Sequence, residues 1–197
     1  MNYLAHFHLA GNDPGFIVGA LLGDYVKGPI AHQYSTEFLN GIILHRRIDR
    51  FSDTHPVQQA VHKVFPAEFR RYNGIIFDML CDYFLSNNWQ QYDQRQLEKY
   101  SASIYQILND HQHLLPTNAR AFSLRLQQYD LLCAYKNRMT IEKTLNSIGN
   151  RLSRANPLTE LIHNFWTVSE ELEENFHSFY QQLLSYSQQQ KHQLIDQ

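Results

Sequence analysis

The chain has 197 residues, of which 43% are hydrophobic and 18% are charged, and its formal net charge is −2. A chain of this length can bury a core as one domain without disulfides. Its near-neutral charge excludes the overall basic field typical of nucleic-acid-binding proteins. The longest apolar run, residues 15–26, is well short of the roughly 20 residues that cross a bilayer, and the start of the chain has no secretory signal. We therefore expect a cytoplasmic protein with no nucleic-acid or membrane partner; the composition does not define an oligomeric state.

Helical periodicity recurs along the whole chain, whereas strand signals are scarce. The sequence therefore predicts an all-α fold, a single-domain helical bundle over residues 1–187. The Gln-rich tail, residues 188–197, is expected to fray. Asp13 before Pro14 is typical of a helix N-terminus, and this first clear helix should end near Val26.

The next three helices are predicted from their caps and boundaries. Ser35 or Thr36 should cap a helix that continues to about Phe51, and a third helix lies between the segments THPV and FPAEF. A fourth helix is expected from Gly74 to Leu85.

The second half of the chain carries weaker helix signals. Asp93 and Gln96 resemble a capping box, and Thr140 is placed to cap a further helix. Asn156 and Pro157 are expected to open a long last helix.

The segment GIILHRRIDRFSDTHP, residues 41–56, is unusually rich in charged and imidazole side chains. Residues four apart on a helix are neighbours, so His45, Asp49 and Asp53 should form one polar stripe beside an apolar face. Such a stripe is half-buried and can point into a cleft. The alternative is a solvated edge, with salt bridges to the arginines of the same segment.

Two acids interrupt the helix predicted around residues 75–85. Every residue there is apolar or aromatic except Asp78 and Asp82, so both carboxylates should be buried. Because an unpaired buried carboxylate is strongly unfavourable, they need a cation: an arginine, a protonated histidine or a metal. The arginines that could serve are Arg46, Arg47 and Arg70.

Two further segments carry polar side chains in apolar surroundings. NYLAHFHLA contains His6 and His8, and GALLGDYVKG contains Asp24 followed by Lys27. Each has a structural alternative, because a core histidine can bond a backbone carbonyl and Asp24 can pair with Lys27.

Histidine and carboxylate ligands without a thiolate suit a divalent ion such as Mn, Mg, Fe or Zn, and such sets occur in metal-dependent phosphohydrolases. The candidate metal ligands are His6, Asp24, His45, Asp49, Asp78 and Asp82, of which Asp24, His45 and Asp49 are the candidate catalytic residues. The candidate phosphate-binding residues are Lys27, Arg46, Arg47 and Arg50. Nucleophilic, P-loop and dinucleotide-binding motifs are missing, and Cys81 and Cys133 are expected to be reduced core thiols.

The sequence resembles the acyl carrier protein phosphodiesterases. The resemblance rests on MNYLAHFHLA at the start, GALLGDYVKG at 19–28, the segment at 41–56 and DMLCDYFLSNNW at 78–89, and it is strong over residues 1–90. It implies hydrolysis of the phosphodiester that joins 4′-phosphopantetheine to a serine of acyl carrier protein, with a divalent cation, typically manganese. It also implies an HD-domain-like fold, although this chain has no adjacent His-Asp pair.

Carried over by position, the resemblance places seven residues in family motifs. It implies that Asp24 lies in a catalytic acidic motif, His45 and Asp49 in a central motif, and Asp78 and Asp82 in a later pair. His6 and His8 match the opening motif.

The family's substrate is an acidic helical protein, so a local basic patch should dock it. The segment VHKVFPAEFRRYNG offers Lys63, Arg70 and Arg71, with an ordinary solvated face as the alternative. Two other functions stay open at this point: a phosphohydrolase of small nucleotides or other phosphodiesters, and a non-catalytic helical module that binds an acidic partner.

Overall fold

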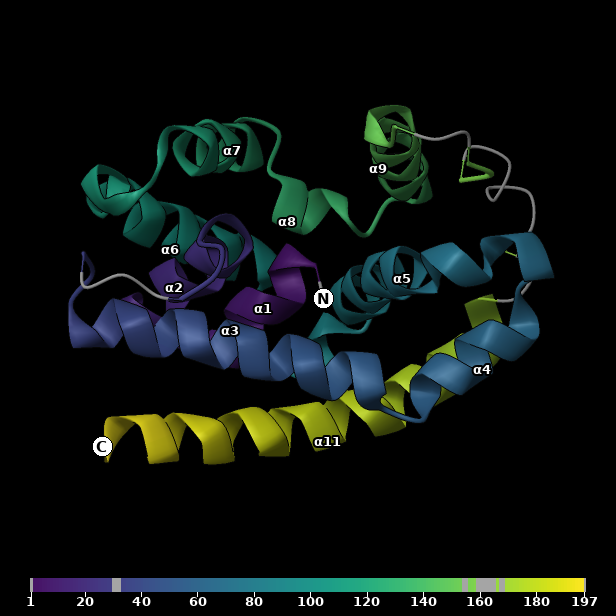
Figure 1. The fold of residues 1–197 in the computed structure, drawn as a ribbon, viewed down its shortest axis with the longest axis horizontal. Coiled ribbons are helices and arrows are strands. Elements are labelled where there is room, and N and C mark those ends of the chain that lie inside the picture. The colour runs from purple at the N-terminus through teal and green to yellow at the C-terminus, as the bar shows by residue number, and fades with distance from the viewer. Residues whose placement is uncertain (1, 30–32, 154–155, 159–165, 167–168, 197) are drawn as a thin grey trace.

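The computed structural model describes residues 2–29, 33–153, 156–158, 166 and 169–196, and within these ranges the chain forms helices and no strand. The predicted all-α fold is confirmed (Figure 1). None of the described helices combines the length and the apolar character that a membrane span requires. The α-helices are α1 (Tyr3–Ala10), α2 (Pro14–Tyr25), α3 (Thr36–Thr54), α4 (Val57–Val64), α5 (Asn73–Asn87), α6 (Leu97–Asp110), α7 (Thr117–Gln128), α8 (Leu131–Ala134), α9 (Arg138–Arg151) and α11 (Ser169–Ile195). Short 3-10 helices are η1 (Ala67–Tyr72), η2 (Trp89–Gln91) and η3 (Gln112–Leu114).

Helix α1 lies at the centre of the bundle. It contacts α2, α3, α5 and α11, so it is covered on several sides (Figure 1). Leu4, Phe7 and Leu9 are fully buried, as expected for a helix that is apolar around its circumference. Polar side chains on α1 therefore face other helices rather than water.

Helices α2 and α3 pack unusually closely along a row of glycines. Gly15, Gly19 and Gly23 recur every four residues on α2, and therefore share one face. A Cβ at Gly19 would overlap the backbone of Gly41 on α3. The missing side chains thus let the two helix backbones approach, which brings the end of α2 beside the middle of α3.

The C-terminal helix α11 runs alongside α3 (Figure 1). Most of the tail, residues 188–197, which the sequence predicts to fray, continues this helix as far as Ile195. Leu194 is buried, and Asn40 of α3 donates a hydrogen bond from Nδ2 to its carbonyl oxygen over 2.8 Å. These contacts with α3 hold the last turns in place.

The helix starts in the first half of the chain follow the sequence signals closely. Asp13 caps α2 as predicted, since its Oδ1 accepts from the backbone N–H of Phe16. Ser35 is the N-cap residue of α3, although its side chain makes no capping hydrogen bond. That helix continues to Thr54, slightly beyond the expected end at Phe51.

Two predicted caps in the second half are wrong. Asp93 accepts from the backbone N–H of Arg95 instead of capping α6, and Gln96 makes no side-chain capping bond. Asn137, rather than Thr140, caps α9 by accepting from the N–H of Met139. In both cases a competing short-range hydrogen bond defines the turn.

The last helix does not begin at Asn156. Residues 156–158 form a turn in which Asn156 Nδ2 donates to the carbonyl of Gly149. Residues 159–165 and 167–168, through which the predicted helix would run, lie outside the described residues.

Candidate metal centre

Three side chains from α1 and α3 converge on one point. His6 Nε2 lies 3.0 Å from Asp49 Oδ1, and His45 Nε2 lies 3.1 Å from Asp49 Oδ2. The two imidazole rings stack with centroids 4.0 Å apart. His45 and Asp49 are neighbours on α3 because they are four residues apart, whereas His6 comes from the central helix. The structure therefore joins two of the predicted motifs in one cluster, His6, His45 and Asp49.

Asp24 stands at the edge of this cluster. Its Oδ1 lies 3.7 Å from His45 Nε2, at the end of α2. The side chains of Asp24 and Asp49 are 42% and 36% exposed, whereas those of His6 and His45 are 2% and 3% exposed. The two imidazole rings of the cluster are thus buried, whereas the carboxylates of Asp24 and Asp49 are partly exposed to solvent.

Tyr3 is a neighbour that the sequence interpretation missed. Burial, and then the nearby negative charge of Asp24, raises the pKa of the Tyr3 hydroxyl far above its usual range. Tyr3 therefore stays protonated next to Asp24. The signal that could have found it is its position three residues before His6, on the same face of α1.

The electrostatics of the cluster depend on Asp49. Burial alone would raise the pKa of Asp49, but the hydrogen bonds from His45 and His6 hold it well below its usual range. Burial lowers the pKa of His6 to about 3, and the adjacent His45 contributes to the lowering. At neutral pH the cluster therefore contains an ionised Asp49 and a neutral His6.

These residues fit a divalent cation. One ligand atom from each of His6, His45 and Asp49 lies within 4.8 Å of the others. Nδ1 of both histidines is buried without a hydrogen-bond partner among the described residues, so Nε2 is the nitrogen that each ring presents to polar groups. Two imidazoles and a carboxylate are a donor set that hard or borderline divalent ions accept.

Asp82 has a different partner from the one expected. Its two carboxylate oxygens accept from the backbone N–H groups of Leu4 and Ala5, each over 2.9 Å. The buried acid thus binds the N-terminus of α1, where unpaired N–H groups and the helix dipole favour negative charge. The structure places Asp82 outside the cluster, in a structural role.

Asp78 lies nearer to the cluster. Burial raises its pKa, and the negative charges of Asp49 and Asp53 raise it further. Asp78 is not among the three residues whose ligand atoms converge, and its role as a ligand stays a prediction.

The predicted phosphate-binding residues are separated by the fold. Arg46 donates to the carbonyl of Val26 over 2.8 Å, next to the exposed Lys27, and Arg50 is also exposed. Arg47 instead donates to Oε1 of a glutamine on α11, Gln190, over 2.8 Å. Arg46 and Lys27 therefore lie beside the end of α2 that carries Asp24, whereas Arg47 connects α3 to α11.

His8 faces away from His6. Its Nδ1 lies 2.8 Å from the hydroxyl of Tyr180 on α11, and its ring meets Trp89 edge-on. Burial lowers the pKa of His8 to about 4. The second histidine of the opening motif therefore packs α1 against α11.

The predicted docking residues fall on two surface hollows. Lys63 and Arg70 line one hollow of about 630 Å³ together with His62 and Phe65. Arg71 lines another hollow, of about 330 Å³, with residues that include Leu152. The structure thus keeps Lys63 and Arg70 together and separates Arg71 from them.

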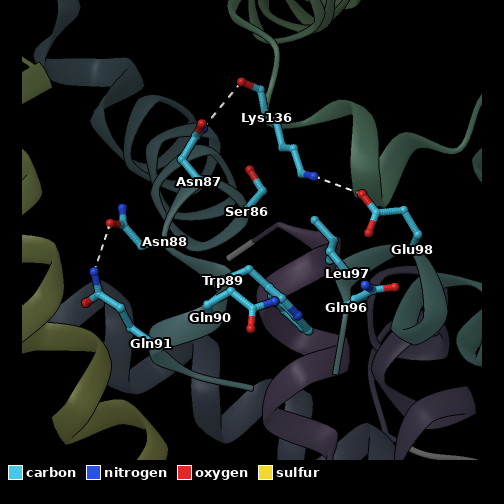
Figure 2. A pocket seen from close by; sticks show the side chains of 10 residues that line it. All are labelled: Ser86, Asn87, Asn88, Trp89, Gln90, Gln91, Gln96, Leu97, Glu98 and Lys136. Atoms are coloured by element: carbon cyan, nitrogen blue, oxygen red, sulfur yellow. Dashed lines mark hydrogen bonds and ion pairs between the residues drawn. The ribbon is translucent and has the colours of Figure 1, made fainter. Parts of the chain in front are cut away.

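A polar hollow of about 600 Å³ lies at the C-terminal end of α5, and none of the predicted site residues lines it (Figure 2). Its walls are largely bonded to one another, since Asn87 donates to the carbonyl of Lys136 and the Lys136 ammonium pairs with Glu98 (Figure 2). The charged groups of this hollow, Lys136 and Glu98, thus neutralise each other, and none of the residues of the histidine–aspartate cluster lines it.

The described part of the chain is all-helical, and two buried histidines and an aspartate converge within it. Helical proteins with such a cluster form a class in which a bound metal ion suits hydrolysis of phosphate esters. Within that class the chain belongs to the acyl carrier protein phosphodiesterase family, a family of phosphodiester hydrolases. The family model described as acyl carrier protein phosphodiesterase matches residues 1–183. The resemblance predicted from the first 90 residues is confirmed and extends over most of the chain.

Relatives named acyl carrier protein phosphodiesterase support this assignment. One from Yersinia enterocolitica is 33% identical over 190 residues, which cover 95% of this chain and 98% of the relative. One from an Enterobacter species is 30% identical over 192 residues, covering 93% and 96% of the two chains. One from Yersinia pestis is 41% identical over 91 residues, or 46% of this chain and 47% of the relative. No solved structure matches the chain, so the HD-domain-like fold stays a prediction.

Proposed function

We propose that this protein is a metal-dependent phosphodiesterase that removes 4′-phosphopantetheine from holo-acyl carrier protein, leaving apo-acyl carrier protein. Membership of the family and the names of the relatives support the substrate. The observation that carries the metal dependence is the convergence of His6, His45 and Asp49. Manganese is the proposed ion, with magnesium, iron or zinc as chemically acceptable substitutes.

His6, His45 and Asp49 are the proposed metal ligands. A divalent cation, when bound, polarises a phosphoryl oxygen and makes water a better nucleophile. Asp24 is half-exposed and 3.7 Å from His45 Nε2, so it can complete the ligand set or move a proton at the entrance. The neutral state of His6 at physiological pH supports ligation, since a protonated imidazole cannot bind a metal.

Lys27, Arg46 and Arg50 are the proposed phosphate-binding residues. All three lie on or next to the helix segments that carry Asp24 and Asp49, and a cationic side chain there would offset the charge of the phosphodiester. Arg47 is left out of this set because its guanidinium reaches Gln190 on α11, whereas that of Arg46 reaches Val26 at the end of α2. Asp82 is likewise left out of the metal ligands, because both of its oxygens cap α1.

Lys63 and Arg70 are the proposed docking residues for the acidic carrier protein. They share one exposed hollow, so their charges add at one place on the surface. We further propose that the enzyme acts in the cytoplasm, in the lipid metabolism that uses acyl carrier protein, and that it does not bind nucleic acid.

The test is a mass measurement on holo-acyl carrier protein. Purified protein is stripped of metal, incubated with the carrier in the presence or absence of Mn²⁺, and the carrier is weighed by mass spectrometry. We expect loss of the mass of the prosthetic group only with Mn²⁺ and not with an Asp49→Ala variant.

The other outcomes separate the rival functions. Cleavage of small nucleotides or other phosphodiesters, with an unchanged carrier mass, would support a general phosphohydrolase. Carrier binding without any mass change, in protein shown to contain Mn²⁺, would support a non-catalytic module.

A further inference from the structure

The ring of His45 lies in a space that a glycine leaves open. Gly23 is buried on the face of α2 that packs against α3. A Cβ at this position would overlap the Cγ and Cδ2 atoms of His45 and would lie 2.8 Å from its Cβ. The overlap thus includes the base of the His45 side chain, next to the α3 backbone. A rotation of the ring alone therefore cannot relieve it.

We propose that Gly23 is a positioning residue: its missing side chain makes the seat that holds the His45 imidazole between Asp24 and Asp49. The inference rests on the proposed metal centre for its functional consequence, but the seat itself is a matter of packing. Inside this seat His45 Nε2 lies 3.1 Å from Asp49 Oδ2 and 3.7 Å from Asp24 Oδ1. Any side chain at Gly23 must displace the ring or push α2 away from α3.

Helix propensity argues against glycine at this position. Alanine is a better helix former than glycine in a helix interior, so a glycine in α2 needs a packing reason. Gly19 has a different packing reason, since a Cβ there would overlap the backbone of Gly41 and not a side chain. The two glycines of the same face therefore serve different neighbours, one a helix backbone and the other the imidazole.

This difference predicts a specific pattern in a double-mutant cycle. Gly23→Ala should lower the urea midpoint strongly in the wild-type background. In a His45→Ala background more than half of that loss should disappear, because the overlapping ring atoms are gone and only the Cβ contact remains. Gly19→Ala should lower the urea midpoint by the same amount in both backgrounds, because its neighbour, the backbone of Gly41, is unchanged.

Manganese affinity gives a second readout that a merely structural glycine would not move. Gly23→Ala, under conditions in which it is fully folded, should bind Mn²⁺ about 10- to 100-fold more weakly than the wild type, as expected when a ligand loses its orientation. Gly74→Ala is the matched control, because nothing lies within 4 Å of a Cβ there. It should leave both the midpoint and the Mn²⁺ affinity unchanged or slightly improved.

The two proposals fail in different ways. Equal midpoint losses for Gly23→Ala in the wild-type and His45→Ala backgrounds would overturn the seat, whatever the metal result. No Mn²⁺ binding by the wild type would overturn the metal centre, while the midpoint cycle would still decide on the seat. If Gly23→Ala does not fold, the double variant Gly23→Ala, His45→Ala should fold; failure of that variant, with His45→Ala alone folded, also overturns the seat.

Discussion

The imidazole of His6 lies almost flat on that of His45, with an angle of 17° between the rings, and both rings turn Nε2 to the carboxylate of Asp49. Two charged imidazoles would repel each other at this distance in a buried site. The contact is therefore compatible with a neutral ring, in agreement with the pKa of about 3 for His6. A neutral imidazole is also the form that binds metals, so the stacking and the proposed ligation require the same protonation state.

The first prediction concerns Asp24. Asp24→Ala should reduce turnover of holo-acyl carrier protein by at least about 100-fold, the typical contribution of a group that ligates or transfers a proton. The free energy of unfolding should change by no more than about 0.5 kcal/mol, because the side chain is 42% exposed. Carrier mass spectrometry measures the rate, and urea unfolding measures the stability.

His45→Ala gives the contrasting result, since this side chain is buried and stacked: both turnover and stability should fall. Asp110→Asn is the control, because Asp110 is exposed and its carboxylate accepts from Gln106 on the same face of α6. A rate for Asp24→Ala close to that of Asp110→Asn would remove Asp24 from the catalytic set.

The second prediction concerns the metal. Because a cation held by His6, His45 and Asp49 binds the native state and not the unfolded chain, Mn²⁺ should raise the melting temperature and a chelator should lower it. At 100 times the dissociation constant the gain is about 2.7 kcal/mol. Differential scanning fluorimetry of stripped and Mn²⁺-loaded protein measures the shift.

The same shift should vanish in Asp49→Ala and persist in Asp82→Asn, because only Asp49 belongs to the converging set. A shift that persists in Asp49→Ala and vanishes in Asp82→Asn would exchange the roles that we assign to these two acids.

The third prediction concerns the pH dependence of stability through Asp82. Burial raises the pKa of this carboxyl to about 7, even though the N–H groups of Leu4 and Ala5 favour the ionised form. Between pH ~4 and ~7 the native state therefore holds a proton that the unfolded chain has released, since a free aspartate has a pKa of about 3.9. The contribution is fully present below about pH 4 and is lost as the pH rises towards 7, with a slope of up to about 1.4 kcal/mol per pH unit.

Asp82→Asn isolates this effect. The asparagine cannot titrate, so the stability difference between the wild type and this variant should shrink steadily from pH 4 to pH 7. Urea unfolding at half-unit intervals measures it. A difference that is constant across this range would mean that Asp82 is ionised throughout.

Most of the fold and the core of the candidate site could be predicted from the sequence, because both rest on short-range spacing. His45 and Asp49 are four residues apart on one helix, and such a pair is adjacent wherever that helix packs. The partner of Asp82 could not be predicted in this way. The apolar surroundings correctly indicated a buried acid that needs a positive partner, but the partner is a helix N-terminus and not a cation.

Arg47 and the C-terminal tail illustrate the same limit. From the sequence, Arg47 is interpreted as a substrate contact, and the Gln-rich tail as a frayed end. In the structure Arg47 donates to Gln190, which belongs to that tail, so the arginine and the tail are partners. Contacts between segments more than 140 residues apart depend on how the helices pack, and periodicity within one helix does not contain that information.

The last prediction concerns docking of the acidic carrier. Lys63 and Arg70 line one hollow, and Arg71, next in the sequence to Arg70, lines another. The paired charge reversal Lys63→Glu, Arg70→Glu should therefore weaken association with the carrier, mainly through a slower on-rate. Arg71→Glu is the matched control and should have a much smaller effect.

In the wild type, turnover of the carrier should decline as salt is raised, whereas the double variant should depend less on salt. Cleavage of a small phosphodiester such as bis(p-nitrophenyl) phosphate, which does not reach the hollow, should be unaffected in both variants. Stopped-flow association and the two turnover assays measure these effects. Equal losses on carrier and small substrate would mean that Lys63 and Arg70 support the fold, and an effect of Arg71→Glu as large as that of the double variant would place the docking surface at the other hollow.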